Sequence, residues 1–301
     1  MIEATPKSVA RPPAHRSPQP SVDPGAAQRV IRIKPSNRFF SLDVRELWHY
    51  RELWLILAWR DVKVRYKQTF LGVAWALIQP FTTMVVFTLI FNRAIGVKAE
   101  YDVPYPLFAF TGLLPWFYFT SSLTNSAQSI VGNSPLVTKV YFPRLLIPLA
   151  SITAPLVDLL CSTTILGGMF VYYGRAPHWH TVAVPIFLAM ALVTALGIGL
   201  WLSALSVRYR DVPYAVPFLT QLWLFASPVV YPVNAYIPHH LRWLLALNPM
   251  TGVLDGVRWT VLGKGLPHYT VFGTSAAVGL LLLVSGLVFF RHTERTFADV
   301  I

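Results

Sequence analysis

The chain has 301 residues, of which 54% are hydrophobic and only 13% are charged, whereas ordinary globular domains carry about 25% charged residues. This composition, with a mean hydropathy of +0.51, excludes a soluble globular domain and indicates a membrane protein. The net charge of +12 would suggest nucleic acid as a partner for a soluble protein. In a membrane protein it is explained by topology signals and by attraction to anionic lipid headgroups, so we expect no nucleic-acid partner.

The N-terminal part of the chain consists of two segments that differ in amino-acid composition. Residues 1–40 are rich in Pro, Ser, Ala and Arg, with too few apolar side chains for a core, and are predicted to form a disordered cytoplasmic tail. Residues 41–67 mix Leu, Trp and Ile with Arg, Glu and Lys, and Ser41 or Asp43 can cap a helix start. This stretch is too charged to cross a bilayer, so we expect an amphipathic helix in the cytoplasmic interface. A cytoplasmic extension of the first span is the alternative.

Residues 68–301 hold six long stretches with almost no charge, each longer than the roughly 20 residues that a helix needs to cross about 30 Å of hydrocarbon. We therefore predict an all-α polytopic membrane protein with six transmembrane helices. The stretches are Gln68–Asn92, Val103–Thr138, Leu145–Gly174, Ala176–Val207, Val212–Leu241 and Gly265–Phe290.

The charges in the connecting segments orient the chain. With six spans both termini lie on one side, and that side carries 19 of the 25 Lys and Arg residues. The positive-inside rule then predicts a multi-pass protein of the cytoplasmic membrane with both termini in the cytoplasm. The distribution still favours this orientation when the tail is left out.

Two connecting segments have more structure than simple turns. The cytoplasmic segment 132–148 contains Pro135, Pro143 and Pro148, which bound a short expected helix at Leu136–Tyr141. The outer segment 231–269 is partly apolar, but its prolines divide it into pieces too short to cross. Such pieces lie in the interface or re-enter partway, protected by protein.

No catalytic or metal-binding group of residues stands out. The sequence has no G-x-x-x-x-G-K-[ST] motif, so the chain cannot bind ATP through a P-loop. The five histidines that fall on the outer side are interpreted as interfacial residues rather than metal ligands: His178, His180, His239, His240 and His268. Asp158 is the one acid at membrane depth. We expect it to have a structural role, hydrogen-bonded to Ser162, to Thr163 or to a neighbouring helix.

Two spans carry stripes of aromatic and amide or hydroxyl side chains at helical spacing. In the first span the stripe is Trp75, Gln79 and Thr82, and in the fifth it is Tyr214, Phe218, Gln221 and Phe225. Aromatic rings offer apolar surface to sugar C–H groups, and Gln and Thr can bond hydroxyls. These residues are candidates for lining a glycan channel. Packing against neighbouring helices or a dimer partner is the alternative.

Four blocks of the sequence carry a family resemblance, and they occur in the order RDVKVRYKQTFLGVAWALIQP, LVTKVYFPRLLIPL, LSVRYRDVPYAVPFLTQLWLFASPVVYP and LLALNPMTGVLDGVRW. Together they resemble the membrane subunits of type-2 ABC exporters of polysaccharides and polyol phosphates, the permeases for O-antigen, capsule and teichoic-acid-type polymers. The resemblance covers about residues 42–301.

The resemblance implies a homodimeric permease, bound to two copies of a separate ATPase subunit that holds ATP and Mg²⁺, with no cofactor and no catalytic residue in this chain. The cargo would be a lipid-linked glycan. Residues 43–67 would correspond to an interfacial gate helix and residues 235–263 to short outer gate helices. The loop 132–144 would correspond to the coupling helix, with candidate contacts at Leu136, Val137, Lys139, Val140, Tyr141 and Arg144.

Two other functions fit some of the same features. An ABC permease for a drug or another lipid differs only in its cargo. A membrane glycosyl- or acyltransferase would need acids or bases that converge at a membrane border, and the few acids of the spans and outer loops do not cluster in sequence.

Overall fold

The computed structural model describes residues 44–67, 72, 74–97, 103–233, 242–263 and 269–297. The chain divides into two units, residues 1–41 and 42–301, and the described residues all belong to the second. The expected tail of residues 1–40 and the capping residues Ser41 and Asp43 lie outside the described residues.

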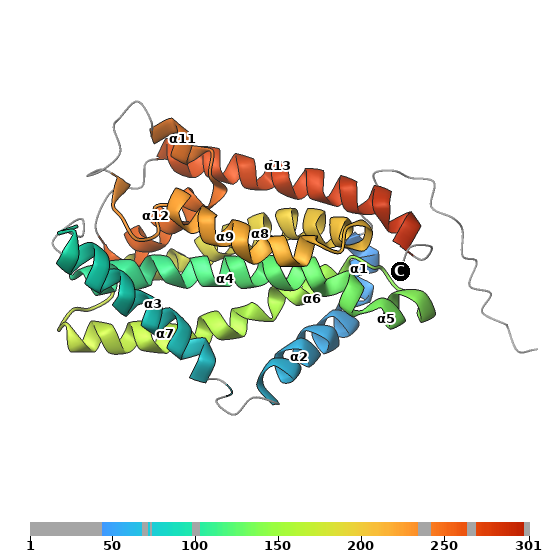
Figure 1. Ribbon diagram of the computed structural model, residues 1–301, viewed down its shortest axis with the longest axis horizontal. Coiled ribbons are helices and arrows are strands. Elements are labelled where there is room, and N and C mark those ends of the chain that lie inside the picture. The colour runs from blue at the N-terminus through green and yellow to red at the C-terminus, as the bar shows by residue number, and fades with distance from the viewer. Residues whose placement is uncertain are drawn as a thin grey trace, which may run out of the picture. The chain divides into compact units, whose positions relative to one another are not determined.

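The described part of the second unit consists of helices and their connections (Figure 1). In chain order these are α1 (Val44–His49), α2 (Arg51–Lys67), α3 (Ala74–Phe87), the π-helix η1 (Thr88–Ala94), α4 (Tyr105–Gly132), α5 (Ser134–Lys139), α6 (Leu146–Thr153), α7 (Pro155–Tyr172), the 3₁₀-helix η3 (Trp179–Ala183), α8 (Val184–Arg208), α9 (Val212–Ala226), α11 (Arg242–Ala246), α12 (Pro249–Leu262), α13 (Tyr269–Thr293) and the 3₁₀-helix η5 (Glu294–Thr296).

The helix expected at residues 41–67 is present as α1 and α2, but α2 does not have a single apolar side. It packs on α6, where Leu57 and Ala58 are buried with Ala150, and Val62 is buried as well. Its opposite side exposes Ile56 and Trp59. Apolar side chains all around a charged helix leave it suited to contact with lipid or with a partner as well as with α6.

Four stretches of the described chain are long and apolar enough to cross a membrane: Ala74–Ala94, Leu146–Tyr172, Trp179–Arg208 and Tyr269–Thr296. The other two spans that we expect correspond to α4, which has 28 residues but is less apolar, and to α9, which has 15 residues. The all-helical, multi-pass architecture is therefore confirmed, and the number of six spans remains a prediction.

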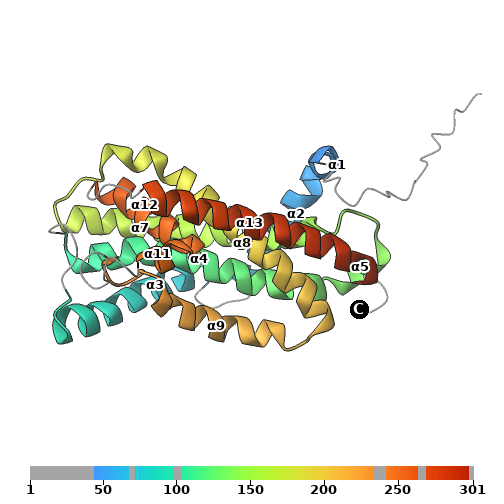
Figure 2. The same cartoon turned by 90° about the horizontal axis from the view of Figure 1, so that it is seen from above.

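Helix α4 lies in the middle of the bundle, in contact with α3, α6, α7, α8, α9 and α12 (Figure 2). Most of its residues are buried. Its approach to α8 depends on small residues, because a Cβ atom added to Gly199 of α8 would lie 2.6 Å from the Ser126 hydroxyl oxygen of α4. Small residues at the contact let membrane helices pack closely. A buried central helix need not be apolar toward lipid, which explains why α4 is less apolar than the outer spans.

Between α9 and α13 the described residues form the short helices α11 and α12, as expected of a segment divided by prolines. Helix α12 has 14 residues, about 21 Å at 1.5 Å per residue, which is too short to cross the hydrocarbon. Its side chains are mostly buried, so protein shields it from lipid. The Asn248 side chain caps its start by accepting from the Met250 N–H at 3.1 Å.

A buried arginine joins α12 to the segment that follows α9. Arg258 donates to the carbonyls of Pro228, at 2.6 Å, and of Val229. Its guanidinium also lies 3.9 Å from the centre of the Phe108 ring of α4, in the geometry of a cation–π contact. Gly112 of α4 makes room for it, since an added Cβ would lie 2.5 Å from an Arg258 terminal nitrogen.

Candidate functional site

A cavity of about 510 Å³ opens where the end of α2 meets α3, α4, α7 and α9. Its walls combine aromatic rings with hydroxyl, amide and charged side chains. The lining includes Arg65 and Tyr66 from α2, Trp75 and Gln79 from α3, Phe117, Tyr118, Thr120, Ser121, Thr124 and Asn125 from α4, Asp158 and Ser162 from α7, and Pro217 and Thr220 from α9.

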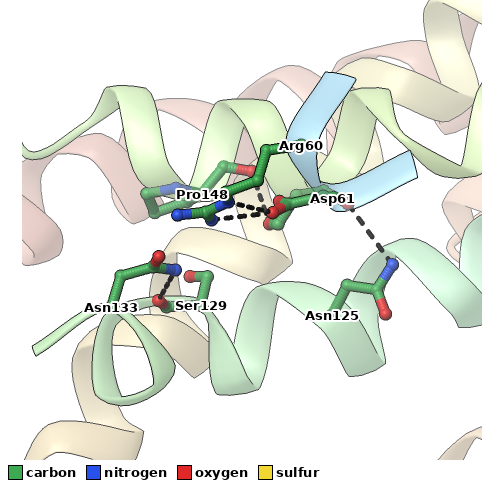
Figure 3. A network of polar contacts seen from close by, with 7 residues as sticks. Arg60, Asp61, Asn125, Ser129, Asn133 and Pro148 are labelled. Atoms are coloured by element: carbon green, nitrogen blue, oxygen red, sulfur yellow. Dashed lines mark hydrogen bonds and ion pairs between the residues drawn. The ribbon is translucent and has the colours of Figure 1, made fainter. Parts of the chain in front are cut away.

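One wall of this cavity is a polar stretch of α4. Thr120, Ser121, Thr124 and Asn125 all line it, so the least apolar part of the central helix lies at the cavity. The Asn125 amide reaches the carbonyl of Ser151 in α6 at 3.5 Å (Figure 3). Hydroxyls and amides at the surface of a cavity can bond the hydroxyls of a sugar.

Asp158 of α7 accepts hydrogen bonds from both Arg65 and Tyr66 at the end of α2. The expectation that Ser162 or Thr163 bonds this carboxylate is wrong, because each donates to a backbone carbonyl instead. The expectation of a partner on a neighbouring helix is confirmed. A carboxylate at membrane depth needs a cation, and Arg65 of α2 supplies it. The Arg65 and Asp158 side chains are 32% and 22% exposed, respectively.

The aromatic and polar stripe of the first span is exposed and partly lines the cavity. Trp75 and Gln79 are lining residues. Thr82 is exposed but is not among the residues that line it. The three side chains share one side of α3, as their spacing predicts.

The stripe of the fifth span is also exposed in this chain. Tyr214, Phe218 and Phe225 are 84%, 63% and 53% exposed, and Gln221 is exposed as well. Helices α3 and α9 lie along the same edge of the bundle in Figure 2, and the rings of Phe87 and Phe225 are 6.5 Å apart. Apart from the contact of Phe225 with Phe87, packing inside this chain does not explain the stripe, whose side chains are available to lipid, to a channel or to a partner protomer.

The loop expected to bind an ATPase forms α5, slightly earlier than the expected Leu136–Tyr141. Val140 and Tyr141 follow its end and are 53% and 78% exposed, and Lys139 is exposed too. Leu136 is half-buried.

Other residues of this loop hold it to the bundle. Val137 is buried in the core formed by the ends of α4, α6, α8 and α13, and Arg144 donates to the Glu294 carbonyl. At the end of α4, the Asn133 side chain donates to the Ser129 carbonyl at 2.7 Å (Figure 3). A force on this loop would therefore reach four helices of the bundle.

The outer histidines that the structure describes form part of a stack of rings. His178 and His180 have ring centres 4.3 Å apart, and His180 lies 4.5 Å from Trp259 of α12. Among the described residues no group of three or more possible ligands could hold a metal ion. His239, His240 and His268 lie outside the described residues.

Three features of these sites could not be located from the sequence. The polar wall of α4 is visible as the run Thr120–Asn125, but nothing in the sequence places it at a cavity. Arg65 and Tyr66 are separated from Asp158 by about ninety residues. The buried contacts of Arg258 join it to carbonyls about thirty residues earlier, and its place inside the largely apolar run TGVLDGVRW is the one sequence signal of such a contact.

Comparison with known proteins gives a consistent result. Residues 52–262 match the family described as ABC-2 type transporter. An O-antigen export system permease protein from Myxococcus xanthus is 34% identical over 86% of this chain and 98% of its own length. A protein of the same description from Klebsiella pneumoniae is 28% identical over 83% of this chain and 95% of its own length. A polysialic acid transport protein from Escherichia coli is 24% identical over 78% of this chain and 91% of its own length.

Replacing Asp158 with Ala should destabilise the protein, because it removes the acceptor of both Arg65 and Tyr66. For a partly exposed ion pair we expect the free energy of unfolding to fall by about 1–3 kcal/mol, which lies between the values typical of surface pairs and of buried pairs. That corresponds to a fall of about 2–4 °C per kcal/mol in the melting temperature of the purified protein. Asp61→Asn on α2 is the matched control, since among the described residues Asp61 forms an ion pair with its half-buried neighbour Arg60 and with no other helix (Figure 3). Equal melting temperatures for the two variants would contradict the assignment, and an Arg65→Asp/Asp158→Arg exchange should recover part of the loss.

Proposed function

Because the chain belongs to the ABC-2 type transporter family, we propose that it is the membrane permease subunit of an ATP-driven exporter of a lipid-linked polysaccharide of O-antigen or capsule type. The proposed cargo is supported by one observation, the similarity of this chain to O-antigen export permeases over 98% and 95% of their length. The alternative cargo, a drug or another lipid, finds no support among these relatives.

We propose that six helices cross the cytoplasmic membrane, with both termini in the cytoplasm. The four apolar stretches supply four of them, and α4 and α9 supply the other two. At 28 residues α4 is long enough to span. Helix α9 is continued by residues 227–231, whose Val229 and Val230 are buried. The uneven distribution of Lys and Arg supports the orientation.

Two copies of this chain would form the exporter, together with two ATPase subunits that hold ATP and Mg²⁺. The absence of a P-loop motif in the sequence supports a separate ATPase. The exposed α3 and α9 stripes support a second copy, because aromatic side chains at 53% to 84% exposure are available to a partner or to cargo.

The glycan would pass along the exposed sides of α3 and α9, beside the polar cavity. Trp75, Phe218 and Phe225 offer apolar ring surface, and Gln79 and Gln221 offer amides. Such surfaces let a polymer slide, because stacking on sugar rings is tolerant of position while amide contacts exchange from one hydroxyl to the next.

The ATPase would contact α5 and the two residues after it. Val140 and Tyr141 are the exposed apolar side chains of this loop, and Leu136 and Lys139 stand beside them on α5. Val137 belongs to the core of this chain and Arg144 to the contact with Glu294, so we assign them to transmitting the motion rather than to binding the ATPase directly.

The orientation is tested by labelling single cysteines in intact cells after Cys161 has been replaced. A cysteine at Arg175 should react with a membrane-impermeant maleimide, because the proposed outer loop follows α7. One at Lys139 should react only after the cells are opened. Labelling of Lys139→Cys from outside would reverse the topology.

Val140→Asp and Tyr141→Asp should stop export while the protein still inserts and folds. Both side chains are exposed, so the change should alter stability by less than about 0.5 kcal/mol. It should place an unpaired charge in the contact with the ATPase. Copurified ATPase and ATP-driven export are measured together. Val137→Ala is the contrast: it should lower the melting temperature, at a cost of about 2 kcal/mol, through lost core packing. Normal copurification and export by both Asp variants would refute the coupling surface.

The double variant Phe218→Ala/Phe225→Ala should lower export of surface polymer without lowering the melting temperature, because both rings are more than half exposed. The control is Trp223→Ala on the same helix. Its ring packs 5.3 Å from that of Phe119, and its loss should cost about 3–5 kcal/mol. Normal polymer export by the stable double variant would remove this side of α9 from the path. A drop in both stability and export would assign the two rings to packing against a partner protomer.

A further inference from the structure

A second cavity, of about 570 Å³, lies between α3 with η1 and the end of α7. Its lining is apolar along most of its length, with Met84 and Leu89 on one side and Ile165 and Met169 on the other. The lining carries a single formal charge, that of Arg93 in η1. We call this cavity the α3–α7 groove.

The groove runs from a membrane border toward the middle of the bilayer. Arg93 and Tyr172 both line it, and they stand at the ends of the apolar stretches Ala74–Ala94 and Leu146–Tyr172. Arginine and tyrosine at span ends lie at headgroup depth. From Phe81 to Arg93 the lining covers about 18 Å at the α-helical rise, slightly less across wider π-helical turns. Half of the hydrocarbon thickness is about 15 Å.

The position of Arg93 is fixed by the π-helix that carries it. The backbone N–H of Ile95 donates to the Ile90 carbonyl at 3.0 Å, five residues back, and the Asn92 amide donates to the Val97 carbonyl at 3.1 Å. π-Helical turns occur frequently at functional sites. Arg93 is exposed, and within the described part of the chain no side chain pairs with it. Its guanidinium is therefore available to an anion at the headgroup level.

The opposite wall of the groove lacks a side chain at Gly168. A Cβ atom added there would meet nothing within 4 Å, and the same holds for its neighbour Gly167, which does not line the groove. Gly168 thus leaves open a space that a larger residue could fill without disturbing the helix contacts.

We infer that the α3–α7 groove binds one acyl chain of an anionic phospholipid of the surrounding bilayer, with the lipid phosphate held by Arg93. The length of the groove fits a chain that ends at the bilayer midplane. The single cation at headgroup depth fits a single phosphate, since guanidinium groups bind phosphate oxygens in pairs. A helix from a second copy would leave the guanidinium without an anion. The inference requires only that α3 and α7 cross a bilayer, and it depends neither on the cargo nor on the orientation.

The test compares lipid binding by four forms of the assembled transporter, the natural chain and the variants Arg93→Gln, Gly168→Leu and Gly167→Leu. Each is stripped of lipid in detergent and titrated with phosphatidylglycerol or with phosphatidylcholine of the same acyl chains. Bound lipid is counted by native mass spectrometry. The natural chain should prefer phosphatidylglycerol by about fivefold, the gain expected of one basic residue at the surface. Arg93→Gln should bind both lipids equally, and Gly168→Leu should bind neither at this site. Gly167→Leu should behave as the natural chain.

Three outcomes would overturn the inference. Equal lipid binding by Gly168→Leu and Gly167→Leu would exclude the groove as the location. A lower dimer fraction in Gly168→Leu, with unchanged lipid count, would mean that a second copy covers the groove. Stabilisation of the natural chain by inorganic phosphate alone, as large as that by phosphatidylglycerol, would mean that Arg93 binds a phosphate without an acyl chain.

Discussion

The enclosure of α4 by six other helices is the constraint on which the rest of the structure depends. In a bilayer there is no hydrophobic driving force between helices, so close packing must come from small residues and from polar contacts. On the side of α8, the small residues are Ser126 of α4 and Gly199 of α8, which lie in contact. The close approach of α13 to α8 has the same origin, because a Cβ added to Gly197 would lie 2.5 Å from the Leu283 backbone nitrogen. Helices in contact with lipid on one side can then be strongly apolar, while α4 keeps polar residues for the interior.

Two groups of polar contacts tie peripheral segments to the bundle. At one end Arg258 reaches the carbonyls of Pro228 and Val229, which no helix satisfies, and Gly112 leaves the space for its guanidinium. Beside the polar stretch of α4, Asp158 holds the end of α2 through Arg65 and Tyr66. Non-helical backbone inside a membrane protein is tolerated only where protein groups or water satisfy it. Both arrangements therefore couple a short segment to a rigid helix.

The polar cavity is lined by the first parts of α3 and α7, the α3–α7 groove is lined by the later parts of the same two helices, and the two differ in chemistry. The polar cavity offers hydroxyls, amides and rings, whereas the groove offers aliphatic surface and one cation. A chain that moves a hydrophilic polymer through a bilayer must separate these two environments, because each buried sugar hydroxyl without a partner costs free energy. The exposed side of α9 lies next to the polar cavity, since Pro217 and Thr220 of the same helix line that cavity.

The sequence by itself determined the helical class, the membrane location, the approximate extent of the long apolar helices and the helical spacing of the two stripes, because hydrophobic length and helical spacing are local properties. It also predicted the short helix near Leu136, displaced by two residues. It did not determine that Val137 points into the core, that α2 buries apolar residues on one side and exposes others on the opposite side, or that Asp158 pairs with Arg65. These contacts join residues far apart in the chain, and only the tertiary structure brings them together. The polar stretch of α4 makes the same point: its residues are plain in the sequence, but whether they face lipid, protein or a cavity was decided by how six helices pack around it.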